Sequence, residues 1–372
     1  MARDVTAVRD MRIMAVGRRL LRWETALVGL LIITFIYGRS ASPNFGSGTD
    51  IFFIGLNVGE IAIMALPLAF IVITGEIDLS VASMLGLSSS LLGYLFEHKW
   101  SIWAAMAVVL VVGAAGGALN GFLVTKVGLP SIAVTIGTLT LFRGIAEIIL
   151  GSSSVSGFPI SFTNIGILPI PHTQIAYSAG IFIVMAVIFG VVLHATPIGR
   201  AIFAIGLQQD AAFFSGIRVT RIKFWLYVLS GVICAFAGIL WTFRFSTSRF
   251  DAGTGLELSV VAVVLLGGVS IFGGRGSILG VVLAVAVLGC FRDALTLVNV
   301  SAQVQNIVTG GLLLVSVVVP NGAEAMRRLR HRIAGGRTRR GETHMAARSD
   351  DASAKPDVVI AAGSPDSSSH PS

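Results

Sequence analysis

The feature that most constrains this chain is a series of long apolar runs separated by short polar breaks. A helix needs roughly 17–25 predominantly apolar residues to cross the hydrocarbon core of a bilayer. The chain is 54% hydrophobic and only 12% charged, which leaves too little polar surface to cover a water-soluble globule. We therefore expect an all-α integral membrane protein, a polytopic helical bundle of about ten transmembrane helices.

The first apolar run begins near Thr25 and follows an arginine-rich segment, Met1–Trp23. It lacks an Ala-x-Ala cleavage site, so we expect a retained first span and not a signal peptide. The other expected spans are Ile51–Thr74, Leu79–Phe96, Ile102–Thr125, Leu129–Leu150, Ile175–His194, Phe224–Phe243, Leu256–Phe272, Ser277–Phe291 and Gln303–Val319.

Two regions, Leu79–Phe96 and Leu256–Phe291, contain frequent Ser and Gly and very short polar breaks. Broken or re-entrant helices are tolerated at membrane depth only where they are buried in protein or line a watery cavity. We expect such short segments in these two regions.

The basic residues predict the orientation of the chain. The formal net charge of +8 could suggest nucleic acid, but the charges cluster beside apolar spans, as they do in cytoplasmic loops of membrane proteins. With both termini in the cytoplasm, few basic residues fall outside. The inside loops then carry Lys126, Thr196–Lys223, Arg275 and the arginine-rich tail, and the outside loops carry Arg39, Lys99, Arg244 and Arg249.

The domain organisation follows from these spans. Residues 1–23 form a cytoplasmic basic N-terminus, and residues 24–320 form the transmembrane domain with a cytoplasmic loop at 196–223. Residues 321–372 form a cytoplasmic tail, arginine-rich at first and then without periodicity, which we expect to be disordered.

The loop Thr196–Lys223 is too polar to span a bilayer and too regular to be a plain linker. Pro197 and Gly199 are expected to break the preceding helix, and apolar residues then recur at helical spacing. The pattern predicts a short amphipathic helix over Ala201–Phe214. Such a helix either rests on the lipid headgroups or presents a docking surface to a cytoplasmic partner.

No enzymatic constellation stands out in the sequence. Gly273–Ser277 resembles a phosphate-binding loop but lacks its spacing and its Lys. The histidines show no metal-ligand spacing, and Cys234 and Cys290 both fall inside apolar segments. We expect no enzyme, no metal site and no nucleotide bound by this chain.

Polar residues within the spans are candidates for function, because charges at bilayer depth are costly and by default face a cavity or each other. The candidates for a translocation pathway are Asn57, Glu60, Asn120 and Glu257. Other polar or glycine positions have structural explanations. Arg143 and Glu147 are spaced for an intrahelical ion pair, Asp78 for capping a helix that begins at Leu79, and Gly113 and Gly117 for close helix packing.

Several motifs together resemble one family, the membrane permeases of bacterial ABC importers of the ribose, rhamnose, xylose and autoinducer-2 type. They keep the family's order and cover nearly all of residues 50 to 320. The matching stretches are Gly75–Ser80, Asn120–Val124, Leu129–Thr138, Arg143–Gly144, Thr196–Arg200, Ala211–Ile217, Glu257–Leu258 and Gly267–Gly276.

The resemblance implies a sugar importer in the bacterial inner membrane. The loop at 196–223 would be its coupling loop, seated in a groove of a separate ATPase subunit with two nucleotide-binding domains that uses ATP and Mg. The other implied partners are an extracytoplasmic sugar-binding protein and a second permease chain, identical or not. The residues expected to act in the coupling loop are Gly199, Arg200, Ala204, Gly206, Gln208, Ala211, Ala212, Ser215 and Gly216, and those expected at structural turns are Gly75, Asp78, Gly273 and Gly274.

Three positions depart from the family pattern. The family usually has Gly where Glu76 stands, Asn where Gln208 stands and Asp where Ser259 stands. The stretch at 65–80 and the loop around Gly157 resemble the rhamnose and autoinducer-2 branches most. The alternative to this reading is an ion-coupled secondary transporter of a small polar solute, which would need an ionisable residue at mid-span such as Glu60, Glu147 or Glu257.

The charge asymmetry gives a first testable prediction. A cysteine placed within Gly151–Thr173, a loop without Lys or Arg, should react with an impermeant thiol reagent in intact cells, because it lies outside. A cysteine placed within His344–Ser372 should not react. Labelling of the tail from outside would reverse the predicted orientation.

Overall fold

The computed structural model describes residues 23–301, 303–311, 314 and 318. The expected basic N-terminus before Trp23 and the expected tail at 321–372 lie outside these residues. The described helices up to residue 311 belong to one compact unit.

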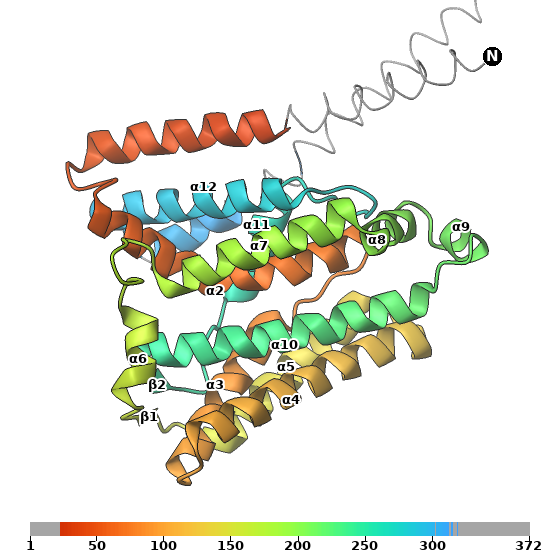
Figure 1. Ribbon diagram of the computed structural model, residues 1–372, viewed down its shortest axis with the longest axis horizontal. Coiled ribbons are helices and arrows are strands. Elements are labelled where there is room, and N and C mark those ends of the chain that lie inside the picture. The colour runs from red at the N-terminus through yellow and green to blue at the C-terminus, as the bar shows by residue number, and fades with distance from the viewer. Residues whose placement is uncertain (1–22, 302, 312–313, 315–317, 319–372) are drawn as a thin grey trace, which may run out of the picture. The chain divides into compact units, whose positions relative to one another are not determined.

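Within the described residues, seven helices are long and apolar enough to cross a membrane. Each coincides with an expected span, and together they make the chain a predominantly helical, multi-pass protein (Figure 1). They are Trp23–Ala41, α2 (Gly48–Ile73), α4 (Ile102–Phe122) with its π-helical continuation η1 (Leu123–Val127), α5 (Ser131–Leu150), α7 (Tyr177–Ala195), α10 (Val219–Phe245) and α12 (Ile278–Leu297).

Three expected spans are not among these seven helices: two form shorter helices, and the last is only partly described. Helix α3 spans Val81–Glu97 and has 17 residues, and α11 spans only Leu256–Leu266 and has 11 residues. The expected last span lies partly outside the described residues, although residues 303–311, 314 and 318 are helical. The count of about ten spans therefore stays a prediction.

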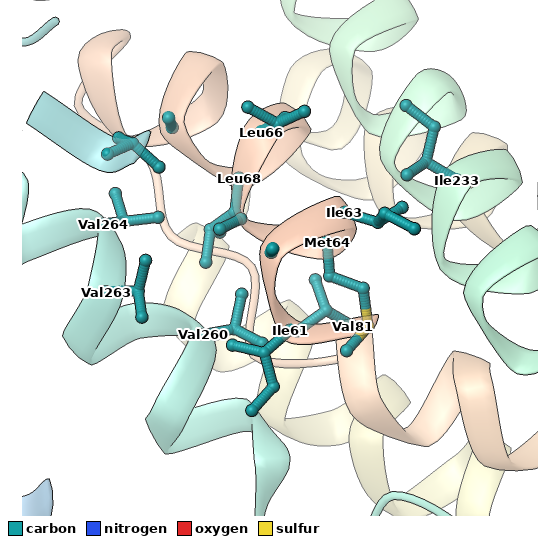
Figure 2. Packing of buried hydrophobic residues seen from close by; sticks show 14 of the residues in the cluster. Ile61, Ile63, Met64, Leu66, Leu68, Val81, Ile233, Val260, Val263 and Val264 are labelled. Atoms are coloured by element: carbon teal, nitrogen blue, oxygen red, sulfur yellow. The ribbon is translucent and has the colours of Figure 1, made fainter. Parts of the chain in front are cut away.

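Helix α2 is the centre of the hydrophobic core. Its residues are buried without interruption from Val58 to Ile73, and it packs against α7, α10, α11 and α12. A helix that is apolar all round lies either in lipid or inside protein, and the continuous burial of this stretch shows that neighbouring helices cover it. Figure 2 shows Ile61, Met64 and Leu68 of α2 among side chains from α3, α10 and α11.

Helices α3 and α11 lie in the two regions where short segments are expected, and a non-helical segment precedes each of them. The segment 74–80 leads from α2 into α3, and its Ile77 N–H donates to Ser131 Oγ of α5 at 3.2 Å. Thr135 Oγ1, one turn further along α5, donates to the Ile77 carbonyl at 3.3 Å. Side chains of α5 thus satisfy backbone groups that a helix would have paired internally.

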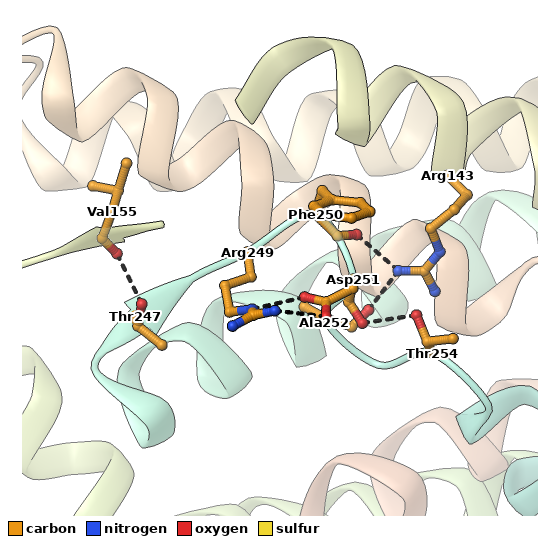
Figure 3. A network of polar contacts seen from close by, with 8 residues as sticks. All are labelled: Arg143, Val155, Thr247, Arg249, Phe250, Asp251, Ala252 and Thr254. Atoms are coloured by element: carbon orange, nitrogen blue, oxygen red, sulfur yellow. Dashed lines mark hydrogen bonds and ion pairs between the residues drawn. The ribbon is translucent and has the colours of Figure 1, made fainter. Parts of the chain in front are cut away.

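Arg143 has the same role for the segment 246–255, which leads from α10 into α11. Its Nη1 donates to the carbonyl oxygens of Phe250 at 2.9 Å and Ala252 at 2.7 Å (Figure 3). The expected ion pair between Arg143 and Glu147 is wrong: it is absent from the ion pairs of the described residues. The guanidinium turns instead toward a segment more than 100 residues away, where unpaired carbonyls need a donor.

A small outer layer joins the helix ends away from the 196–223 loop. Strand β1 (Val155–Ser156) pairs antiparallel with β2 (Thr247–Ser248), and α6 (Ile160–Ile167) lies beside the end of α10. The aromatic ring of Phe243, near the end of α10, contacts those of Phe158 and Phe162 there. These contacts show that the loop 151–173 packs against the C-terminal end of α10.

The loops that the charge pattern assigns to one side of the membrane lie together. Gly274 N donates to the Ile73 carbonyl at 2.8 Å, and Gly206 of the 196–223 loop packs against both of these residues. The end of α2, the 196–223 loop and the turn before α12 therefore share one side. Which compartment this side faces stays a prediction.

Helices α4 and α10 pack at backbone distance through glycines. A side chain at Gly113 or Gly117 of α4 would collide with backbone atoms of Gly231 or Tyr227, and one at Gly231 of α10 would collide with α4. Small residues let membrane helices approach until backbone atoms touch. The close packing expected of Gly113 and Gly117 is confirmed.

This packing gives a second prediction. Gly117→Leu should lower the melting temperature of the purified permease by several degrees, because overpacking a tight contact costs about 1–3 kcal/mol. Gly137→Leu is the matched control. Gly137 lies on α5, and no atom of the protein lies within 4 Å of the position that a side-chain Cβ would take there. Equal melting temperatures for the two variants would contradict the assignment of Gly117 to the helix contact.

Candidate functional site

The stretch Thr196–Lys223 forms two short helices before α10, not the single helix expected over Ala201–Phe214. α8 spans Pro197–Leu207 and α9 spans Gln209–Phe214. Pro197 opens α8, because a proline at the first helical position lacks an N–H that would be unpaired anyway, and Thr196 Oγ1 caps the helix by accepting from Gly199 N. The extended backbone of Gln208 separates the two helices.

Both helices bury one face against the protein and present the other to the outside. Ile205 of α8 and Ala212 of α9 are buried together with Val219 of α10. Leu207 is 70% exposed, and Phe213 and Phe214 of α9 are 65% and 85% exposed. Figure 1 shows α9 beyond the end of α8. We call Leu207, Phe213, Phe214 and the exposed Ala211 between them the α9 surface.

The residues expected to act in the coupling loop divide by exposure. Arg200, Gln208, Ala211, Ser215 and Gly216 are exposed, Ala204 and Gly206 are half-buried, and Gly199 and Ala212 are buried. The exposed Leu207, Phe213 and Phe214 were not among the residues expected to act in the coupling loop. The two phenylalanines lie within the matching stretch Ala211–Ile217, which was the signal that could have found them.

Gly199 and Gly206 pack against their own chain. A side chain at Gly199 would collide with the Leu193 carbonyl, and one at Gly206 with the Ile73 carbonyl and the Gly274 amide. These glycines therefore hold α8 against the ends of α7 and α2. The exposed apolar side chains of the loop are instead those of the end of α8 and of α9.

A buried cation joins α9 to the turn after α2. Lys223 Nζ of α10 lies 2.6 Å from Glu76 Oε1 and 2.6 Å from Gln209 Oε1. From the sequence, Lys223 was a flanking positive charge of the loop, and Glu76 was a polar residue at the break after Gly75 and a departure from the family pattern. The structure brings the two together across 147 positions of sequence.

The candidate pathway residues lie in three separate places. Glu60 Oε2 and Asn57 Oδ1 of α2 both accept from the Arg244 guanidinium, at 2.9 and 2.7 Å. Asn120 of α4 donates to Ser80 Oγ at 2.8 Å, and Glu257 of α11 accepts from Gly255 N at 3.2 Å. The structure thus joins Asn57 to Glu60 and separates both from Asn120 and Glu257.

Asp78 lies in a buried polar cluster where α3 begins. Its Oδ1 accepts from Ser80 N at 2.9 Å and Ser80 Oγ at 2.6 Å, and its Oδ2 accepts from Ser230 Oγ of α10 at 3.1 Å. The expectation of a helix beginning at Leu79 is wrong by two residues, because α3 begins at Val81 with Ser80 at the N-cap. The carboxylate therefore holds the turn before α3 and ties it to α10.

The three glycines expected at structural turns, Gly75, Gly273 and Gly274, all have positive φ angles. Gly75 has φ of 84° and follows the last turn of α2, and Gly274 has φ of 71° and lies against Leu207. Gly273, at 78°, precedes it. Such angles strain residues with a side chain.

Among the described residues, no group of three or more His, Cys, Asp or Glu is placed to hold a metal ion.

A family model described as the permease component of the branched-chain amino acid transport system matches residues 51–317. The chain is also similar to the autoinducer 2 import system permease protein LsrD of Photorhabdus temperata, with 32% identity over 333 residues, 88% of this chain and 98% of the relative. Proteins of that name from Escherichia coli K12 and Shigella flexneri are 33% identical over 305 residues, 80% of this chain and 91% of each relative. No solved structure matches the chain.

Proposed function

This chain belongs to the family of permease components of branched-chain amino acid transport systems, and from that premise we propose that it is the transmembrane subunit of an ATP-binding cassette importer for a small carbohydrate. It is a permease and not an enzyme. The substrate class is a monosaccharide or related compound, such as rhamnose, ribose or an autoinducer-2-like molecule. Relatives named as autoinducer 2 import permeases, together with the motif order in the sequence, support this class.

The observation that carries the proposal is the α9 surface. Apolar side chains exposed on a short helix outside the spanning segments have no partner within the described chain to cover them, and apolar patches of this kind mark interaction sites. A separate ATPase subunit with two nucleotide-binding domains would receive α9 in a groove and would use ATP and Mg. Its closing and opening would drive alternating access in this chain.

Two further partners complete the proposed importer. An extracytoplasmic binding protein would deliver the carbohydrate to the side that carries β1, β2 and α6. A second permease chain, identical or not, would form the pathway with this one. The site of action would be the bacterial inner membrane.

An ion-coupled secondary transporter is the alternative that the sequence left open. Such a transporter needs a titratable carboxylate that is free to bind an ion. Of the candidates, Glu60 is engaged by the Arg244 guanidinium at 2.9 Å and Glu257 accepts from Gly255 N at 3.2 Å, which leaves Glu147. The α9 surface also has no role in ion-driven transport. The structure therefore supports the importer more than this alternative.

Energy supply separates the two functions and gives a third prediction. In proteoliposomes that contain the permease pair, the ATPase and the binding protein, carbohydrate uptake should continue after an ionophore dissipates the ion gradients. Uptake should stop when ATP is withdrawn, because the ATPase supplies the driving force. Uptake that needs the gradient and ignores ATP would establish the secondary transporter.

Docking through α9 gives a fourth prediction. Ala211→Glu should abolish co-purification of the ATPase and carbohydrate uptake, because it places a bulky unpaired charge within the α9 surface. Permease abundance should stay normal, since Ala211 is exposed and outside the spans. Asn44→Glu adds the same charge to an exposed turn before α2 and should leave ATPase co-purification unchanged. If α9 only rests on headgroups, the Ala211 variant will retain the ATPase.

A further inference from the structure

We propose that Lys223 is a positioning residue that transmits movement of α9 to the segment 74–80, and hence to the start of α3. This inference rests on the proposed function, because the ATPase subunit proposed above would supply the movement of α9. Lys223 donates to Glu76 and to Gln209 at 2.6 Å each. These two acceptors belong to the turn after α2 and to α9, so one ammonium group connects two elements that are not adjacent in sequence.

Burial makes the connection difficult to break. The Lys223 side chain is only 6% exposed and that of Glu76 is 19% exposed. Removing an ammonium group from water is costly unless carboxylate and other acceptors replace the lost hydration. A displacement of α9 that carried Gln209 away would leave the ammonium with an unmet hydrogen bond. We therefore infer that Lys223, Glu76 and Gln209 move together.

Among the described residues, α9 is otherwise held by α8 and by the first turns of α10. Ala212 packs in a small apolar cluster with Ile205 and Val219, while Phe213 and Phe214 are exposed. The polar connection through Gln209 is thus the contact by which α9 reaches the turn after α2. Gly206 of α8 supplies a second, purely steric contact with the end of α2 at Ile73.

From Glu76 the contacts continue along the backbone into the buried polar cluster. The next residue, Ile77, is held by Ser131 and Thr135 of α5, and Asp78 is held by Ser80 and Ser230. Ser80 is in turn the acceptor for Asn120 of α4. A shift of Glu76 therefore acts on the junction of α3, α4, α5 and α10. Asn120 of α4 and Ser230 of α10 are the polar side chains of this junction that contact Ser80 and Asp78.

A purely structural ion pair is the competing explanation. It predicts that loss of the contact lowers the amount of folded permease and lowers uptake and ATPase binding together. A positioning role predicts a different result, because the complex would assemble and hydrolyse ATP while carbohydrate uptake per ATP falls. The two are separated by measuring permease abundance, ATPase co-purification, ATP hydrolysis and uptake in the same reconstituted importer.

Gln209→Met is the sharpest variant. It preserves side-chain length, removes the acceptor on α9 and leaves the Lys223–Glu76 pair in place, and Gln209 is exposed, so folding should be retained. We expect normal abundance, normal ATPase co-purification and about a ten-fold loss of uptake per ATP hydrolysed, a typical size for coupling between sites. Wild-type uptake per ATP in this variant would overturn the proposal.

Charge exchange tests the buried pair itself. Lys223→Met should uncouple uptake from ATP hydrolysis, and Glu76→Lys combined with Lys223→Glu should restore much of the uptake, because a glutamine amide can donate to a carboxylate as well as accept from an ammonium. Arg221→Met removes a basic residue of the same helix that is exposed, and it should not uncouple. Equal loss in the Arg221 and Lys223 variants would overturn the proposal.

The outcomes also separate this inference from the proposed function. If the unaltered chain neither binds the ATPase nor takes up carbohydrate with ATP, the importer itself is wrong. If the unaltered chain does both and Gln209→Met behaves identically, only the role of Lys223 is wrong. Should Lys223→Met fail to insert in the membrane, the result with Gln209→Met decides.

Discussion

The structure depends on one constraint: backbone groups that leave a helix within apolar packing must find another hydrogen-bond partner. The chain leaves its helices at 74–80 and again at 246–255, and both segments lie against α5. Ser131, Thr135 and Arg143 of that helix supply the missing partners. α5 thus permits two short helices, α3 and α11, to begin inside the bundle.

Close helix contact makes these interruptions possible, since side chains reach unpaired backbone groups only across short distances. The glycines of α4 and α10 bring those helices together at backbone distance, and Gly238 of α10 does the same against Leu85 of α3. Gly86 of α3 leaves room for the Arg143 guanidinium and the Ala252 carbonyl. Asp78 can then reach Ser230 of α10, and Asn120 of α4 can reach Ser80. The polar cluster at the start of α3 is therefore a consequence of glycine packing as much as of its own residues.

Much of the fold was predictable from hydropathy alone, because a long apolar run has few alternatives to a spanning helix. The family resemblance, drawn from the order of short motifs, is confirmed by the family model.

The hydrogen-bond and packing partners of individual residues were not predictable from the sequence. Spacing suggested Glu147 for Arg143, yet the true acceptors are Phe250 and Ala252, and a helix wheel contains no information on residues 107 and 109 positions away. Likewise, the contact of Gly206 with the Ile73 carbonyl arises because α8 lies against the end of α2, and the sequence does not indicate that placement.

Glu76 shows how a departure from a family pattern acquires a physical reason only in three dimensions. A carboxylate beside the buried end of α2 is unfavourable when considered alone, and Gly would be expected there on the family pattern. Lys223 is equally unfavourable alone, because its ammonium lies within the protein near the first turns of α10. Placed 2.6 Å apart, each supplies what the other lacks, and Gln209 completes the hydrogen bonds of the ammonium. The two charges are therefore best regarded as one feature, and neither residue can be interpreted, or replaced, without the other.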